Sequence, residues 1–149
     1  MDNYGSLVDL LIKDEMHGNP QHERVLLLGE TPEYLRHHAS FDELTLVTTG
    51  KVIGKAHFDH GITASMLKRL PQLVNNPKCV FDPANPMHRH SVVVLTFELK
   101  GSSPIIIPIR RNVRIGRSQQ FNLVTSVYGK EGPDPETKWK AENLLIWES

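Results

Sequence analysis

SVVVLTFELKGSSPIIIPIRR, residues 91–111, places two runs of branched apolar residues on either side of the polar segment Lys-Gly-Ser-Ser. Branched and aromatic side chains favour strands, and a short loop that contains glycine favours a hairpin between them. The stretch therefore predicts an antiparallel hairpin. Because Pro108 lies inside the second strand and has no backbone N–H, we expect an unpaired side or a bulge at this position.

Further strand-like runs lie on both sides of this hairpin. They are KCVFD (residues 78–82), QFNLVTSVYGK (120–130) and LLIWES (144–149). Asp134 and Pro135 are typical of the first residues of a helix, so we expect a short helix before the last strand. Residues 76–149 therefore predict an antiparallel sheet of four to five strands.

The first half of the chain has a mostly helical pattern. Tyr4, Leu7, Leu10 and Leu11 recur at three- and four-residue steps, which predicts a peripheral helix within residues 1–22. Residues 23–75 predict helices that begin after Thr31, near Lys51 and after Thr63, with short strands in ERVLLLGE (23–30) and ELTLVTTG (43–50). Helices followed by a sheet predict one α+β domain over residues 1–149, with the helices packed on one face of the sheet.

Composition limits the classes of function. The 17 basic and 17 acidic residues cancel among the 149 of the chain, so no overall field would attract nucleic acid or an anionic membrane, and any basic site must be local. Cys79 is the only cysteine, which excludes an internal disulfide and a cysteine-rich zinc site. No apolar run approaches the roughly 20 residues that span a bilayer. We therefore expect a soluble protein that does not contact a membrane.

The densest group of reactive side chains lies in GKVIGKAHFDHGIT, residues 50–63. His57 and His60 are three residues apart on a predicted helix, with Asp59 between them and Lys55 upstream. The spacing allows a metal site, although it does not reproduce a strong zinc signature. Histidine is also the usual general acid or base near neutral pH. Ordinary hydrogen bonding at the end of a helix is the third interpretation.

Four arginines form a second group: Arg110, Arg111, Arg114 and Arg117. Guanidinium groups bind phosphates through paired hydrogen bonds, so this segment is either a phosphate-binding surface or a solvated basic turn. On a regular strand the third group, Ser126, Tyr128 and Lys130, would lie on one face together with Asn122. Such a face is either a solvated ladder of polar groups or a site for an anion.

Histidine, lysine, arginine and hydroxyl groups together suit the cleavage of RNA. The 2′-hydroxyl of RNA is itself the nucleophile, so the protein needs only an acid, a base and cations that stabilise the phosphate. This chemistry requires no cofactor and no metal.

An ordered series of segments resembles the phage MuF C-terminal domain family. The segments are GETPEYL, KVIGKAHFDHGIT, LKRLPQLVNNPKCVF, SVVVLTFEL, PIIIPI and NLVTSVYGK, and they cover residues 28–147. That family is similar to the tips of polymorphic toxins, within the wider group named after barnase, EndoU, colicin nucleases and RelE (the BECR group). The resemblance implies a BECR-like α+β fold.

The resemblance also implies a metal-independent ribonuclease toxin that cleaves tRNA or other RNA, with a cognate immunity protein. Such a toxin would act in the bacterial cytoplasm after delivery from a larger exported or phage protein. The catalytic residues would be His60, Lys55, Ser126, Tyr128 and Lys130. We expect substrate contacts from Arg110, Arg111, His57 and Asn122. The alternative is a non-catalytic, phage head-associated module that keeps the fold for protein contacts.

Overall fold

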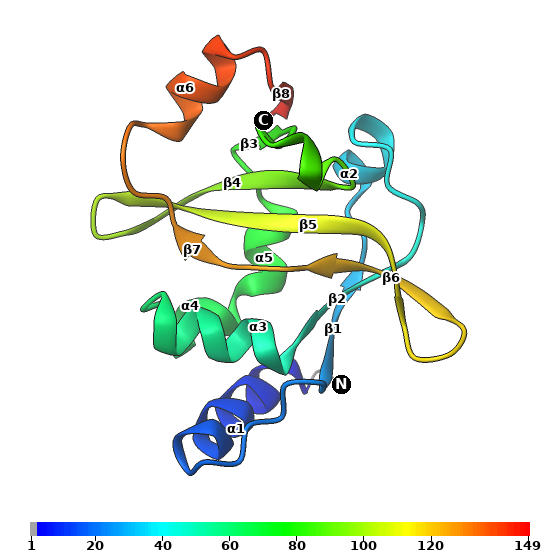
Figure 1. The fold of residues 1–149 in the computed structure, drawn as a ribbon, viewed down its shortest axis with the longest axis vertical. Helices are drawn as coiled ribbons and strands as arrows, with labels where there is room; N and C mark the ends of the chain where they lie inside the picture. Colours follow the sequence, from blue (N-terminus) through cyan, green and yellow to red (C-terminus); the bar gives the residue numbers. More distant parts are fainter. Residues whose placement is uncertain (1–2) are drawn as a thin grey trace.

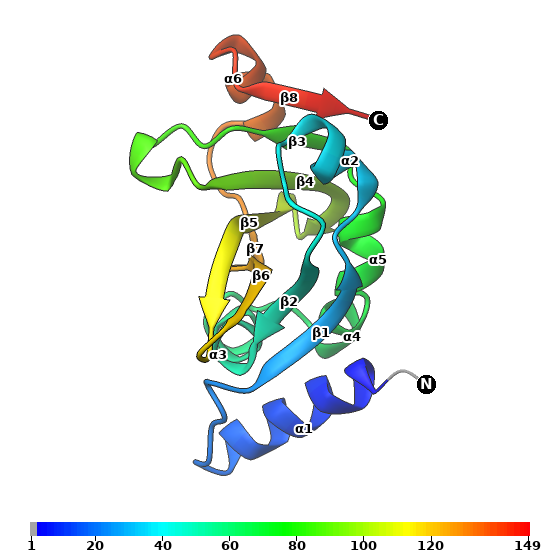
Figure 2. The same cartoon turned by 90° about the vertical axis from the view of Figure 1, so that its right-hand side faces the viewer.

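The computed structural model describes residues 3–149 and has an α+β architecture built around one sheet (Figure 1, Figure 2). The strands are β1 Val25–Glu30, β2 Thr45–Thr49, β3 Cys79–Phe81, β4 Ser91–Lys100, β5 Ser103–Ile115, β6 Gln119–Val124, β7 Tyr128–Gly129 and β8 Leu145–Glu148. The helices are α1 Tyr4–Met16, α2 Glu33–His38, α3 Gly50–Gly54, a π-helical turn η1 Lys55–Asp59, α4 Ala64–Lys68, α5 Leu70–Asn75, a 3₁₀ turn η2 Pro86–His88, and α6 Pro135–Ala141.

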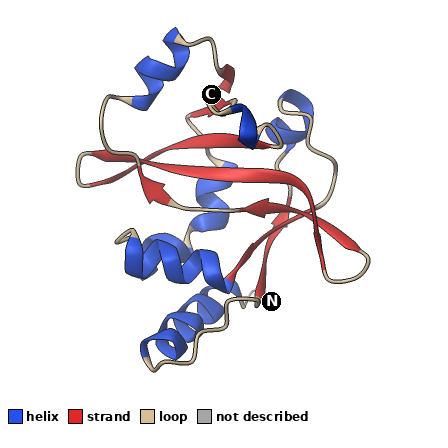
Figure 3. Ribbon diagram, viewed as in Figure 1, coloured by secondary structure: helices blue, strands red, loops and turns tan. Residues whose placement is uncertain are grey.

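The predicted hairpin of β4 and β5 is confirmed and forms the centre of the sheet. The two strands are antiparallel, with Val94 opposite Ile107 and Leu95 opposite Ile106. Neighbouring residues of a strand point to opposite faces. Val94 and Ile107 therefore belong to a large core beneath the helices, whereas Leu95 and Ile106 belong to a smaller core with Trp139 of α6. Figure 3 shows α3, α4 and α5 grouped away from α6.

The sheet is larger than the predicted four to five antiparallel strands. Its order is β1-β2-β6-β5-β4-β3-β8, with β7 also paired to β5, and β2 runs parallel to β6. Leu46, Val47 and Thr48 of β2 are all buried, as expected for a strand covered on both faces. The Thr48 hydroxyl also donates to the carbonyl of Val124 at 3.1 Å. This pairing joins segments far apart in the chain, so local patterns did not reveal it.

Helix α1 contributes to the large core, although the sequence predicted a peripheral helix. Its buried side chains are Tyr4, Val8, Leu11 and Ile12, whereas Leu10 of the predicted stripe is 43% exposed. The Tyr4 hydroxyl donates to the carbonyl of Leu67 in α4 at 2.6 Å. α1 is therefore fixed to the helices that cover the sheet. No helix within residues 3–149 has the length and apolar character needed to cross a membrane.

Two of the three predicted helix caps are confirmed. Thr63 accepts from the backbone N–H of Met66, and Asp134 accepts from that of Thr137. Thr31 does not cap α2, because its hydroxyl donates to the carbonyl of Leu44 and accepts from the side chain of Asn122.

A bulge opposite Pro108 confirms the irregularity predicted for β5. Ile109 pairs with Val124 and Ile106 pairs with Tyr128, so three residues, 125–127, lie opposite two. Thr125 donates its backbone N–H to the Pro108 carbonyl at 3.0 Å. An extra residue reverses the alternation of side chains beyond it. The expectation of a regular strand over 120–130 is therefore wrong: Val124 faces the large core, whereas Tyr128 packs against the small one.

Two glycines, at the start and end of α3, provide a test of how closely α3 packs against the N-terminal part of the chain. A methyl group at Gly50 would overlap the backbone carbonyl of Gln21, whereas one at Gly54 would overlap only the Glu15 carboxylate. We expect Gly50→Ala to lower the free energy of unfolding by about 1–3 kcal/mol, as overpacking does. Gly54→Ala should cost less, because a side chain can rotate away and alanine favours the helix. Urea denaturation checks both values, and equal losses would contradict this packing.

Candidate functional site

His60, Tyr128 and Lys130, which the family resemblance implied as catalytic residues, line one surface depression of about 350 Å³. The lining residues are Asp59, His60, Lys100, Tyr128, Gly129, Lys130 and Glu131. The His60 and Tyr128 rings face each other with centroids 5.5 Å apart and an interplanar angle of 42°. The helical segment before Gly61 and the outer edge of the sheet therefore form opposite walls of this depression, which we call the His60 depression.

A π-helical turn places His60. The backbone N–H of His60 donates to the carbonyl of Lys55 at 3.0 Å, and that of Ile62 donates to Ala56 at 2.9 Å. Buried Ala56 and Ile62 fix the turn to the core. Gly61, with φ +66°, then ends the segment. Single π turns inside helices occur frequently at functional sites.

The bulge and strand β7 place Tyr128 and Lys130. Gly129 pairs with Ile105, and the backbone N–H of Lys130 donates to the Pro104 carbonyl at 2.8 Å. Tyr128 is half-buried against the small core, and this burial raises the pKa of its phenol. The phenol therefore stays protonated at neutral pH and acts as a hydrogen-bond donor.

Lys100 is a site residue that the sequence reasoning missed. A methyl group at Gly129 would lie 3.2 Å from Lys100 Cβ, and one at Gly61 would lie 3.2 Å from Lys100 Nζ. The stem of Lys100 therefore crosses β7, and its ammonium group reaches the residue that follows His60. Both glycines leave room for this path. Lys100 is at the end of β4, and no local pattern connects it with a histidine 40 positions earlier.

The charges of the depression are balanced and unpaired. Lys100 and Lys130 are cationic, whereas Asp59 and Glu131 are anionic, and none of the four forms an ion pair with the described residues. The His60 ring also has no hydrogen-bond partner within residues 3–149. Protonation of His60 would therefore give the lining a net positive charge. Such a site can hold an anion and move a proton.

Three of the predicted residues lie around the depression and not in its lining. Lys55 is exposed at the start of the π turn, and Ser126 lies in a neighbouring pocket that shares Tyr128. Nδ1 of His57 donates to the carbonyl of Ile62 at 2.8 Å, in the tautomer that carries a proton there. His57 thus stabilises the turn that carries His60, in keeping with the interpretation of ordinary hydrogen bonding.

The predicted substrate-binding residues Asn122 and Arg111 have structural partners. Asn122 is fully buried; its side chain donates to Thr31 and Asp42 and accepts the backbone N–H of Asn112. The prediction that Asn122 contacts substrate is therefore wrong, because its side chain lies in the core, on the same face of β6 as Val124. Arg111 donates twice to the Ala39 carbonyl.

Arg110 remains available for substrate. It is exposed and lines a separate depression with His90, Asn112 and Arg114. Ile105, opposite Gly129, is five residues away along β5, which is roughly 17 Å of extended chain. Arg110 therefore lies beyond the reach of a group held by His60, but within the reach of a longer chain.

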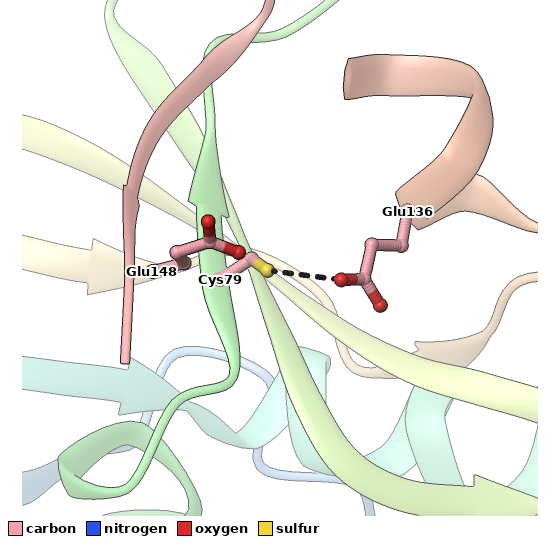
Figure 4. A group of neighbouring side chains, drawn as sticks. All are labelled: Cys79, Glu136 and Glu148. Carbon is pink, nitrogen blue, oxygen red and sulfur yellow. Dashed lines mark hydrogen bonds between the residues drawn. The ribbon is translucent and has the colours of Figure 1, made fainter. Parts of the chain in front are cut away.

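A possible metal-ligand group lies away from the two histidines. Within the described residues, Cys79, Glu136 and Glu148 are the one set of three ligating side chains close enough to share an ion (Figure 4). Burial raises the pKa of the Cys79 thiol to about 11, which opposes the thiolate that a metal requires. The carboxylates already bind the ammonium groups of Lys78 and Lys140. The arrangement fits an ion-pair cluster that joins α6 to β3 and β8.

Asn122 should be a stability residue. Asn122→Ala would remove three hydrogen bonds from the core and would leave the backbone N–H of Asn112 without its acceptor, and we expect it to lower the free energy of unfolding by about 2 kcal/mol. Asn75→Ala is the matched control, because Asn75 is exposed and bonds only to the Pro71 carbonyl; it should cost less than about 0.5 kcal/mol. Equal losses in urea denaturation would refute the assigned role.

Glu136 should make stability depend on acid. Hydrogen bonds from Lys78 and Lys140 lower the pKa of its carboxyl from 4.5 to about 2. A lowered pKa in the folded state means that this stabilisation is complete above pH 4.5 and is lost as the pH falls through about 2. Glu136→Gln should therefore lower the free energy of unfolding by up to about 1 kcal/mol at pH 7. The loss is no larger because solvent screens the charges of the exposed lysines.

The same cost should shrink steadily as the pH falls toward 2. Urea denaturation at several pH values measures it. Glu142→Gln is the control, because Glu142 is exposed near the end of the same helix and forms no ion pair with the described residues. A cost for Glu136→Gln that does not vary with pH would contradict the assigned ion pairs.

Comparison with known proteins agrees with the resemblance found in the sequence. Residues 51–149, about two thirds of the chain, match the profile of the phage MuF C-terminal domain, a family associated with polymorphic toxins. The segment GETPEYL lies before the matched residues. No curated protein and no solved structure matches the chain. The match includes α3 from its second residue, the π turn, the β4–β5 hairpin and β7, and the chain belongs to the phage MuF C-terminal domain family.

Proposed function

We propose that this protein is a metal-independent endoribonuclease of the toxin type. One observation carries the proposal: His60 faces Tyr128 in a depression that also holds two lysines, Lys100 and Lys130, without ion-pair partners among the described residues. A histidine beside cationic and phenolic donors is suited to a phosphodiester whose own 2′-hydroxyl attacks.

The proposed reaction assigns a task to each lining group. A base takes the proton of the 2′-hydroxyl, the 2′-oxygen bonds to phosphorus, and the bond from phosphorus to the 5′-oxygen breaks. An acid then protonates the leaving oxygen, which gives a 2′,3′-cyclic phosphate and a 5′-hydroxyl. His60 serves as acid or base, and a neighbouring carboxylate, Asp59 or Glu131, is suited to accept the proton when His60 donates one.

Lys100 and Lys130 would neutralise the charge that develops on the phosphate oxygens. Tyr128, a phenol whose pKa burial raises, would donate a hydrogen bond to one of these oxygens. Lys55 and Ser126 are not among the residues that line the depression, so this scheme gives them no direct role, and Arg110 would contact a more distant phosphate of the same chain.

The BECR fold is part of the proposal. It is supported by helices that precede a largely antiparallel sheet, and by a histidine at the end of a helical segment facing an edge strand. The parallel pair β2–β6 and the strands β1 and β8 would then be additions to a smaller antiparallel centre. We further propose tRNA as the substrate, the bacterial cytoplasm as the place of action, and a cognate immunity protein as the inhibitor.

Incubation of the purified protein with total tRNA in EDTA tests the proposal. Wild type should cleave, and His60→Ala should lower the rate by about 10²–10⁴-fold, the usual worth of a general acid or base. Lys100→Ala and Lys130→Ala should each lower it by about 10²-fold. Lys55→Ala is the matched control on the same helical segment and should change the rate little.

Intact tRNA, together with normal growth of bacteria that express the chain, would overturn the proposal. Loss of activity in EDTA would instead indicate the metal-dependent alternative at His57 and His60.

The second candidate is a non-catalytic, phage head-associated module. Its support is the exact balance of 17 basic and 17 acidic residues, because most nucleic-acid enzymes have a basic excess. If this candidate is correct, His60→Ala will leave partner capture unchanged and no variant will affect RNA.

A further inference from the structure

A second pocket, of about 380 Å³, adjoins the His60 depression and shares Tyr128 with it. We propose that this pocket binds one unstacked nucleobase of a single-stranded RNA whose phosphate lies in the His60 depression. The inference rests on the proposed function, since it assigns the nucleotide next to the reacting phosphate. We call this pocket the base pocket.

Its floor is apolar and comes from three neighbouring strands. Val93 of β4 lies directly opposite Pro108 of β5, and Tyr128 of β7 follows on the other side. These groups are half-buried and therefore keep one surface open to solvent. An aromatic ring, a proline ring and a branched aliphatic group together present a surface on which a planar base can stack.

The bulge opposite Pro108 forms one side of the base pocket. Because residues 125–127 lie opposite only two residues of β5, Thr125 and Ser126 both line the pocket, whereas Val127 is buried in the large core. A regular strand would place only one of the two on this face. The irregularity therefore supplies an additional polar side chain at the edge of an apolar floor.

The remaining sides carry groups that suit the edge of a base. His88 and Asn85 come from the loop between β3 and β4, and Ser91 begins β4. In Figure 2 this loop projects from the sheet on the side away from α5. The hydroxyls of Ser91 and Ser126 have no hydrogen-bond partner within residues 3–149. A hydroxyl both donates and accepts, so these groups can meet the polar edge of any base.

The position of Tyr128 links the two sites. Its ring contacts the His60 depression on one side and lines the base pocket on the other. In a bound nucleotide, the phosphate would occupy the His60 depression, and the base, which is displaced from the phosphate along the surface, would occupy the base pocket. A paired base is stacked inside a helix and has no free face for such a pocket, so the arrangement selects single strands, loops or ends over duplexes.

The test uses equilibrium binding, so it does not require cleavage. The probe is a short DNA strand that contains one 2-aminopurine. The strand cannot be cleaved because DNA lacks the 2′-hydroxyl, and the fluorescence of the 2-aminopurine reports stacking. The comparison strand has an abasic site in place of that base. Wild type should bind the base-containing strand at least about 10-fold more tightly, in keeping with stacking on one aromatic side chain, and the fluorescence should fall.

Two variants of the pocket keep the test specific. Ser91→Leu places a side chain across the floor and should abolish the preference for the base, while affinity for the abasic strand is unchanged. His88→Ala removes an exposed side chain at no cost to the core and should reduce the preference several-fold. His37→Ala is the control, because His37 is an exposed histidine on α2, outside the lining of either site.

Equal affinity of wild type for the base-containing and abasic strands would overturn the proposal, as would equal affinity for the probe and its duplex. A base preference in a protein that cleaves no RNA would support the base pocket and refute the ribonuclease. Cleavage of RNA without a base preference would support the ribonuclease and refute the base pocket. The two proposals can therefore fail independently.

Discussion

The missing N–H of Pro108 is the constraint on which the site depends. β5 lies in the middle of the sheet, with β4 on one side and both β6 and β7 on the other. At Pro108 the second side cannot receive a ladder hydrogen bond from β5, and the neighbouring chain bulges there. The bulge places Tyr128 on the opposite face from Asn122, so Asn122 bonds inside the core while Tyr128 lines the depression. One absent donor thus decides which polar groups stabilise the core and which face solvent.

Local patterns were sufficient for the hairpin, the caps at Thr63 and Asp134 and the irregularity at Pro108, because each depends on residues close together in the chain. They were insufficient where a distant segment decides the outcome. The β2–β6 pair joins segments far apart in the chain, and Thr31 accepts a hydrogen bond from Asn122, 91 residues away. A period of two also placed Asn122 and Tyr128 on one face, whereas the extra residue within 125–127 reverses the face of everything after it, Tyr128 included.

The same distinction applies to the site. His60, Tyr128 and Lys130 were expected at one site because of the resemblance to the phage MuF C-terminal domain family, and the structure brings them together. Lys100 was missed because a lysine at the end of a strand is ordinary, and only the packing of its stem over two glycines connects it to His60. Arg111 and His57 were proposed for their chemistry, yet each binds a backbone carbonyl that only the folded chain presents.

The parallel pair β2–β6 also defines what a minimal folding unit must contain. The family match begins at Lys51, just after β2. A chain cut at that boundary would leave β6 with an open row of backbone donors and acceptors, and the core would lose the side chains of α1, β1 and β2. Open edges of this kind invite pairing with other chains. The family profile and the stable domain therefore have different limits: the profile begins at residue 51, whereas protection of the sheet begins with α1.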